Sequence, residues 1–210
     1  GESDVQPQRI CSPLHVTAIT CDSHDGSYGR LLEWHTTTGQ LRRWAMPMAM
    51  LSGNGEELRR ILLENGLTYI STRPALRSLL CEYISRSLPG RRVTCVEKTG
   101  WHNGVYVLPD EVIGPGGDNV ILQGSHYLTG GFAQSGTLAE WQEQVAALCA
   151  GNSRLIFAVC CALAAPLLRL TGTGGGGFHL RGESTDGKTT VMKVAASVCG
   201  GTDYWHSWRA

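Results

Sequence analysis

The stretch "FHLRGESTDGKTTVMKVAASVCGG", residues 178–201, joins a short apolar segment, a glycine-containing loop and a helix-forming segment. Its middle part, "GESTDGKTT" at residues 182–190, fits the pattern G-x-x-x-x-G-K-[ST]. "FHLRG" predicts a strand at 178–182, and "KTTVMKVAASV" predicts a helix at 188–198 that ends at the two glycines after it. The sequence therefore predicts a strand, a loop and a helix in direct succession.

The predicted loop supplies the groups that bind the phosphates of a nucleoside triphosphate. Gly182 and Gly187 allow backbone N–H groups to approach phosphate oxygens, and the N-terminus of the following helix favours anions. The ammonium of Lys188 would neutralise the β- and γ-phosphates of ATP, and the Thr189 hydroxyl would hold Mg²⁺. The other positions of this predicted ATP–Mg²⁺ site are Glu183, Ser184, Thr185, Asp186 and Thr190.

Two points about this loop stay open at the level of sequence. Asp186 either accepts a hydrogen bond inside the loop or points to solvent; a catalytic base is not expected here, because that carboxylate normally comes from another strand. Chance alone produces the motif in about one of a hundred chains of this composition. The alternative is an ordinary glycine turn before a core helix.

Hydrolysis of ATP requires more than this loop. An acidic residue at the end of a hydrophobic strand usually orders Mg²⁺ and the attacking water. After Lys188 the sequence contains one predicted helix and "TDYWHSWRA", residues 202–210, with no such strand. We therefore expect the truncated start of an α/β P-loop NTPase domain that lacks a Walker B carboxylate and is inactive alone.

Residues 1–134 are predicted to form an α+β domain. Alternating apolar residues from Pro13 to Leu51 predict an antiparallel meander, with Met46, Met48 and Met50 facing the core. Helices are predicted at 56–64 and 74–87, and strands return within 91–114. The apolar stripe expected on the second helix consists of Leu76, Leu79, Leu80 and Tyr83.

Residues 135–210 are predicted to form a helical segment followed by the start of the P-loop domain. "LAEWQEQVAALCA" at 138–150 predicts an amphipathic helix with Trp141, Val145 and Leu148 on one side. The apolar run from Leu155 to Leu168 is shorter than the about 20 residues of a membrane span, so it predicts a buried helix at 154–168 and no membrane partner. The absence of a signal peptide and of C-x-x-C spacing among the eight cysteines favours the cytoplasm.

The formal net charge is zero, but the charges are unevenly distributed. Residues 30–98 contain eleven basic and six acidic side chains, and fifteen of the eighteen basic residues are arginine, which suits contacts to phosphates. Three adjacent pairs are candidate DNA contacts: Arg42, Arg43, Arg59, Arg60, Arg91 and Arg92. An ordinary solvated face explains these pairs equally well.

The chain resembles the DUF927 family of bacterial and phage proteins, found in primase–helicase-like replication proteins of plasmids, prophages and other mobile elements. The resemblance spans residues 29–210 and includes "GEELRRILLENGLTY", "EKTGWHNGVYVLPDEVIG", "GGGGFHLRGESTDGKTT" and "YWHSWRA". It implies an ATP- and Mg²⁺-dependent motor of the ring-forming, hexameric helicase type that acts on DNA. Gly182, Gly187, Lys188 and Thr189 would take the phosphate-loop roles, and a Walker B strand would follow residue 210. In the "TGWH" turn, a core anchor at Trp101 and a hydrogen-bonded turn residue at His102 are favoured over base stacking.

Two functions follow as hypotheses. The first is an N-terminal fragment of a DNA helicase-like P-loop ATPase of mobile-element or phage replication, with ATP and Mg²⁺ as cofactors. The alternative is a module that binds DNA or a replication partner and has no activity of its own. An oligomerisation domain with a vestigial loop is a third possibility.

Overall fold

The computed structural model describes residues 7–123, 132–201, 204 and 205, and these residues form two compact units. The first unit contains the described residues up to Glu97 together with Gly116–Gln123. The second contains Lys98–Pro115 and the described residues after Gln123. The predicted domain division at residue 134 stays a prediction, and the compact units divide the chain at other positions.

The first unit is built on a five-stranded mixed sheet of order β3-β2-β1-β4-β8. Its strands are β1 (His15–Cys21), β2 (Gly29–His35), β3 (Leu41–Pro47), β4 (Arg92–Val96) and β8 (Val120–Leu122). The first three strands pair antiparallel, which confirms the predicted meander. β4 pairs parallel with β1, and β8 parallel with β4. The parallel half was not predicted, because parallel partners are distant in sequence.

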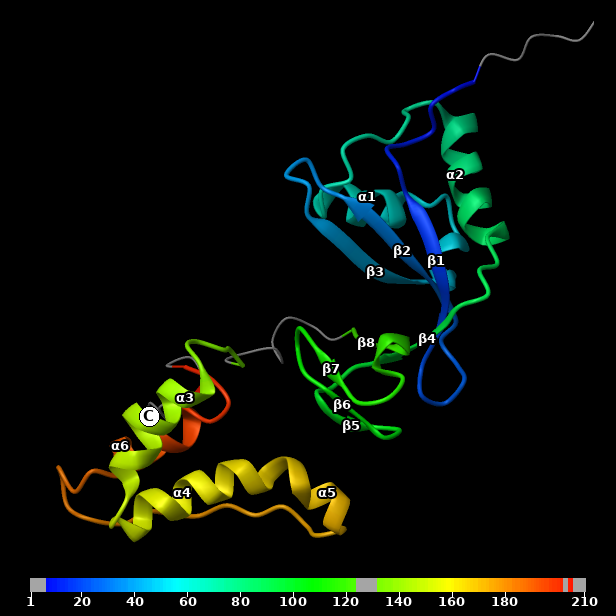
Figure 1. Ribbon diagram of the computed structural model, residues 1–210. Helices are drawn as coiled ribbons and strands as arrows, with labels where there is room; N and C mark the ends of the chain where they lie inside the picture. Colours follow the sequence, from blue (N-terminus) through cyan, green and yellow to red (C-terminus); the bar gives the residue numbers. More distant parts are fainter. Residues whose placement is uncertain (1–6, 124–131, 202–203, 206–210) are drawn as a thin grey trace, which may run out of the picture. The chain divides into compact units, whose positions relative to one another are not determined.

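Two helices, α1 (Glu56–Glu64) and α2 (Pro74–Arg86), connect β3 to β4 and lie against the sheet (Figure 1). Both were predicted, and Pro74 occupies the first turn of α2 as expected. Leu58 and Leu62 of α1 and Leu80 of α2 pack with residues of β2 and β3 in the main hydrophobic cluster. This cluster is the larger of the two buried clusters in the first unit.

Two predicted apolar patterns are wrong in detail. Leu79 and Tyr83 are exposed, and α2 instead turns Leu76, Leu80 and Ile84 to the core, an i, i+4, i+8 set. Met46 is fully buried as expected, but the strand ends at Pro47, and Met48 and Met50 lie in a 3₁₀ turn, η1 (Met48–Leu51). From that turn they still pack against the main cluster.

A register shift in β1 decides which residues face the helices. The pairing between β1 and β2 is irregular between Val16 and Ala18. Val16 packs against the main cluster, whereas Ala18 belongs to a second buried cluster with Leu31, Ala45 and Val93. Because an extra residue in one strand reverses the side-chain alternation, Val16 and Ala18 contribute to different clusters although they are two residues apart.

Arg30 is a buried cation held at the C-terminal end of α2. Its side chain is 7% exposed, and it donates from Nε to the Ser87 carbonyl at 2.8 Å and from Nη2 to the Ser85 carbonyl at 3.4 Å. The last carbonyls of a helix have no partner within the helix and carry partial negative charge. The guanidinium therefore satisfies these carbonyls and ties α2 to β2.

The second unit contains a small antiparallel sheet, β5 (Gly100–His102), β6 (Val105–Val107) and β7 (Val112–Ile113). Asn103 and Gly104 both have positive φ and form the two-residue turn typical of an Asn-Gly hairpin. Trp101 packs edge-to-face on Tyr106 and donates from Nε1 to the Pro166 carbonyl at 2.6 Å. A ring nitrogen of His102 lies 2.8 Å from the Lys98 carbonyl. These contacts agree with the anchoring role expected of Trp101 and with a hydrogen bond at His102. The expected turn at "TGWH" is wrong, because Gly100 to His102 form β5 and the turn follows at Asn103 and Gly104.

The predicted helix at 138–150 is present, but the residue that it buries near its end differs from the predicted one. Residues 138–149 are helical in three pieces, α3 (Leu138–Trp141), a π-helical turn η4 (Gln142–Ala146) and η5 (Ala147–Cys149). The Thr137 hydroxyl and the Glu140 carboxylate form a capping box at its start. The expected position of Leu148 is wrong: it is 74% exposed, and Cys149 is buried instead. The wider π turn delays the return to the packed face by one residue.

The expectation of a buried helix at 154–168 is also wrong. Helical residues run from Ser153 to Thr171 through α4 (Ser153–Ala164), η6 (Ala165–Leu167) and α5 (Leu168–Thr171). Pro166 sits at the start of the 3₁₀ turn and does not end the run. Only 6% of its most apolar 18-residue window is buried, and by length and composition alone the run could cross a membrane. Ile156 and Phe157 are among its exposed side chains.

The last helix, α6 (Lys188–Ala196), packs against α4. Its start agrees with the prediction to the residue. The strand predicted at 178–182 is absent from the described structure, in which residues 173–183 have no regular secondary structure. An extended segment becomes a strand only when a neighbouring strand pairs with its backbone groups, and this segment has no such neighbour among the described residues.

Neighbouring leucines of α1 provide a test of the main cluster. Leu62 is fully buried, whereas Leu63 is 50% exposed. Leu62→Ala is expected to lower the free energy of unfolding by about 2–5 kcal/mol, because it removes buried methyl groups and leaves a cavity. Leu63→Ala should change it by about 0.5 kcal/mol or less. Urea unfolding followed by circular dichroism measures both, and equal losses would contradict the assigned packing of α1.

Candidate functional site

The loop before α6 is shaped by two residues with left-handed backbone. Thr185 has φ +78° and Gly187 has φ +79°. Gly187 is also the N-cap of α6, and no side chain caps this end of the helix. The helix is established directly afterwards, since Val191 donates its backbone N–H to the Gly187 carbonyl at 3.0 Å. The first N–H groups of α6 are therefore left free of a side-chain cap, as a phosphate-binding helix start requires.

Asp186 folds back onto the loop. Its Oδ2 accepts a hydrogen bond from the backbone N–H of Glu183 at 2.6 Å. A Cβ atom at Gly182 would lie 2.5 Å from the same Oδ2, so this approach depends on a glycine there. Of the two interpretations that the sequence leaves open for Asp186, the structure supports the hydrogen bond inside the loop.

The Lys188 side chain connects the end of the loop to its start. Its Nζ donates to the Gly182 carbonyl at 2.8 Å and also to the Glu183 carbonyl. An ammonium group has three N–H donors, so one remains for a ligand. The start and the end of the predicted loop, Gly182 and Lys188, are thereby brought together.

The loop encloses a concavity of about 430 Å³ whose lining is continuous from Ser184 to Thr190. Ligand pockets usually measure about 300–1,000 Å³. The lining offers backbone N–H groups, the Lys188 ammonium and the hydroxyls of Thr189 and Thr190, but only one carboxylate, that of Asp186. This set of groups suits an anion with several oxygens, and a threonine hydroxyl such as that of Thr189 is an oxygen ligand of the kind that Mg²⁺ takes. No cluster of three or more His, Cys, Asp or Glu side chains that could hold a metal by itself exists in the described residues.

The six candidate arginines lie on separate elements of the first unit. Arg42 and Arg43 belong to the edge strand β3, and Arg59 and Arg60 belong to α1. Arg91 and Arg92 lie at the start of β4, which β2 and β1 separate from β3 in the sheet. The structure places them on three elements and keeps the β3 and β4 pairs on different strands.

Most of these arginines are engaged by neighbouring groups. Arg43 pairs with Glu33 at 3.0 Å, and Arg59 donates to the Asn54 carbonyl at 2.7 Å. Arg91 donates to the Asp118 carbonyl. Arg60 contacts Glu57 and Glu64 at 2.7 and 2.6 Å, and its hydrogen bond lowers the pKa of Glu57. Within the described part of the chain, the side chains of Arg42 and Arg92 make no hydrogen bond or ion pair.

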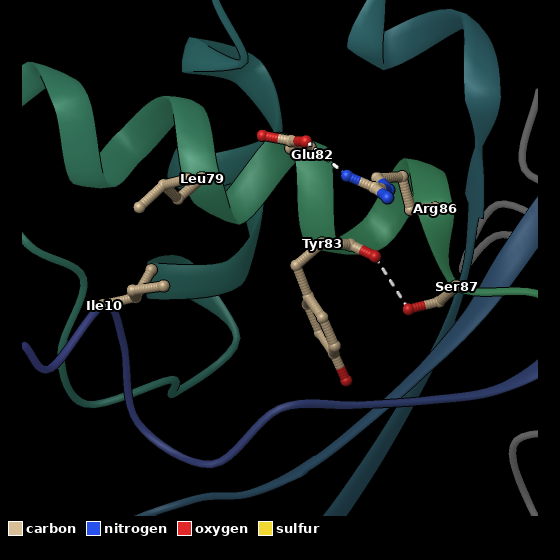
Figure 2. Close-up of a pocket in the computed structure, with 6 residues that line it drawn as sticks. All are labelled: Ile10, Leu79, Glu82, Tyr83, Arg86 and Ser87. Atoms are coloured by element: carbon tan, nitrogen blue, oxygen red, sulfur yellow. Dashed lines mark hydrogen bonds and ion pairs between the residues drawn. The ribbon is translucent and has the colours of Figure 1, made fainter. Parts of the chain in front are cut away.

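A second, more open concavity of about 390 Å³ lies beside α2. Figure 2 shows the residues that line it. Leu79 and Tyr83 line it from the helix together with Ile10 from the chain before β1. Glu82 and Arg86 form an ion pair at 2.9 Å at its rim, and the Tyr83 hydroxyl donates to the Leu14 carbonyl at 3.1 Å. This concavity could not be predicted from the sequence, because an apolar stripe on a helix predicts packing in the core rather than an exposed surface.

The backbone of Gly187 can be tested independently of any ligand. Gly187→Ala should destabilise the second unit by about 1–2 kcal/mol, because a side chain disfavours the left-handed conformation although the space around it is open. Gly176→Ala is the matched control, since that glycine has no positive φ and no atom near its Cβ position. Hydrogen exchange of the α6 amides reports the loss. Equal exchange in the two variants would contradict the strained turn at Gly187.

The comparisons with known proteins bear on the whole chain. The model of a family described as "Domain of unknown function (DUF927)" matches residues 1–210. A solved structure described as "SCCmec type IV Cch - active helicase" is similar in fold, with a TM-score of 0.67 and 20% sequence identity. The similarity covers 95% of this chain and 39% of the helicase chain, so this chain spans well under half of that protein's length. No curated protein matches. Because the family model matches from the first residue to the last, the chain belongs to the DUF927 family.

Proposed function

We propose that this chain is the nucleotide-binding front part of a DNA helicase-like P-loop ATPase of a mobile element or phage, which acts in the cytoplasm. The observation that carries the proposal is the closed loop at 182–188 placed directly before an uncapped helix start. The similarity in fold to a protein described as an active helicase supports the same function.

The proposed site binds ATP through three kinds of group. The free N–H groups at the start of α6 and the positive end of the helix dipole would hold the phosphate oxygens. The Lys188 ammonium would reach the β- and γ-phosphates with the N–H that its two carbonyl contacts leave free. The Thr189 hydroxyl would ligate the Mg²⁺ that accompanies ATP, and this ion would neutralise charge on the phosphates.

Hydrolysis would need a carboxylate that orders water near the γ-phosphate, and the residues that line the concavity supply only Asp186. That side chain is already engaged with the Glu183 N–H. We therefore propose that these 210 residues bind nucleotide and hydrolyse little, and that the remaining catalytic groups belong to a longer protein. The share of the helicase chain that this chain covers, 39%, is consistent with that arrangement. A hexameric ring of the parent protein is part of the same proposal.

Removal of the Lys188 ammonium tests nucleotide binding. Lys188→Ala should weaken binding of ATPγS–Mg²⁺ at least about tenfold, because a charge-assisted hydrogen bond contributes about 1.5–3 kcal/mol. Lys193→Ala removes the same charge from the same helix, one turn further on, and should leave binding nearly unchanged. Isothermal titration calorimetry measures both affinities.

Thr189→Ala extends this test to the metal. It should reduce the gain in affinity that Mg²⁺ brings and leave metal-free binding almost as it is, because only the ion depends on the hydroxyl. Absence of ATPγS binding by the unmodified chain, or equal losses in Lys188→Ala and Lys193→Ala, would refute the proposed site.

The second part of the proposal is that the first unit binds DNA. Of the six candidate arginines, we propose Arg42 and Arg92 as the phosphate contacts. These are the two candidate arginines whose side chains make no hydrogen bond or ion pair within the described residues. Arg60 lies between two carboxylates, which would repel phosphate.

A salt-dependent mobility shift with a single-stranded oligonucleotide tests this. Arg42→Ala combined with Arg92→Ala should weaken binding about tenfold and flatten the salt dependence, because each lost phosphate contact reduces the slope by about one. Arg60→Ala is the control and should have little effect. If no shift occurs at low salt, or if Arg60→Ala weakens binding as much as the double variant, the first unit does not bind DNA through these arginines.

A further inference from the structure

One bond in the candidate phosphate loop has no part in the binding scheme described so far. The Asp186 carboxylate is the acceptor for the backbone N–H of Glu183 at 2.6 Å. Asp186 also lines the concavity at 184–190. A residue with a negatively charged side chain thus belongs to the lining of a site whose other residues suit an anion.

We propose that the Asp186 carboxylate competes with a phosphate oxygen for the Glu183 N–H and thereby sets the affinity of the site for phosphate-containing ligands. This inference rests on the proposed function of residues 182–190. Asp186 acts as an internal competitor: it holds a loop N–H that a phosphate would otherwise use, and its charge opposes an incoming phosphate.

The geometry around Asp186 favours competition over a permanent brace. The loop is exposed, so the carboxylate can turn out to solvent when a ligand enters. Gly182, which carries no Cβ, provides the space that lets Oδ2 approach the backbone. The loop has an independent closure through Lys188, whose ammonium contacts the Gly182 and Glu183 carbonyls. Release of Asp186 therefore leaves the loop held at both ends.

A purely structural role makes the opposite prediction. If Asp186 served only to order the loop, its loss would disorder the N–H groups and weaken ligand binding. An asparagine, which keeps an oxygen acceptor for the Glu183 N–H, would then restore the affinity. Under competition, the asparagine removes the repulsion and keeps the acceptor, so its affinity falls between that of the unmodified chain and that of the alanine variant.

The experiment is a calorimetric titration of ATPγS–Mg²⁺ into the unmodified chain, Asp186→Ala, Asp186→Asn and Glu143→Ala. Glu143→Ala removes one negative charge from an exposed position of η4, outside the loop, and controls for net charge. We expect Asp186→Ala to bind about tenfold more tightly than the unmodified chain, which corresponds to about 1.4 kcal/mol. Asp186→Asn should be intermediate, and the control should be unchanged. Circular dichroism verifies that each variant is folded.

Each other outcome is decisive. If the unmodified chain binds and Asp186→Ala binds equally or more weakly, the competition is refuted while the nucleotide site stands. If Glu143→Ala gains as much as Asp186→Ala, the gain is a general charge effect and the inference is wrong. If neither the unmodified chain nor Asp186→Ala binds, both this inference and the proposed function fail.

Discussion

The left-handed turn at Gly187 is the constraint on which the functional interpretation depends. With φ at +79°, this residue begins α6 without a side-chain cap and directs Lys188 back towards Gly182. Without that turn the ammonium and the first helical N–H groups would not converge on one concavity. The loop is thus ordered by its own contacts, from the Asp186 carboxylate on one side and the Lys188 ammonium on the other. Under the proposed function, such a site would bind phosphate by exchange of internal contacts for contacts with the ligand.

The first unit has a different source of order, which is long-range packing. Its sheet joins an antiparallel meander to a parallel extension, and α1 and α2 supply the residues that bury Trp34 and Met46. The Arg30 guanidinium connects β2 to the end of α2 through backbone carbonyls. A buried charge is tolerated there because several carbonyl oxygens replace its water. Neither buried cluster of this unit contains a residue of the loop at 182–190.

Elements that depend on neighbouring residues in the sequence could be predicted, whereas strand pairing between distant segments could not. The bounds of α1 and the start of α6 follow from residues within a few positions of each other. The parallel pairing of β4 and β8 needs partners that only the tertiary fold brings together. The strand at 178–182 was predicted from apolar residues alone, and it is absent where nothing pairs with it. Similarly, the apolar run from Leu155 to Leu168 indicated a buried helix, yet the helical run of 153–171 is largely exposed, because hydrophobicity does not specify what covers a helix. For the site, the motif identified the residues, but the engagement of Asp186 with Glu183 could be learned only from the backbone geometry.

The central claim is that residues 182–190 bind the phosphates of ATP. Backbone amide hydrogen exchange of this chain, with and without ATPγS–Mg²⁺, tests it most directly because it resolves individual segments. Strong protection of the amides from Gly187 to Thr190, with little change in the first unit, is the predicted result. Protection confined to other segments, or no protection at saturating nucleotide, would contradict the claim.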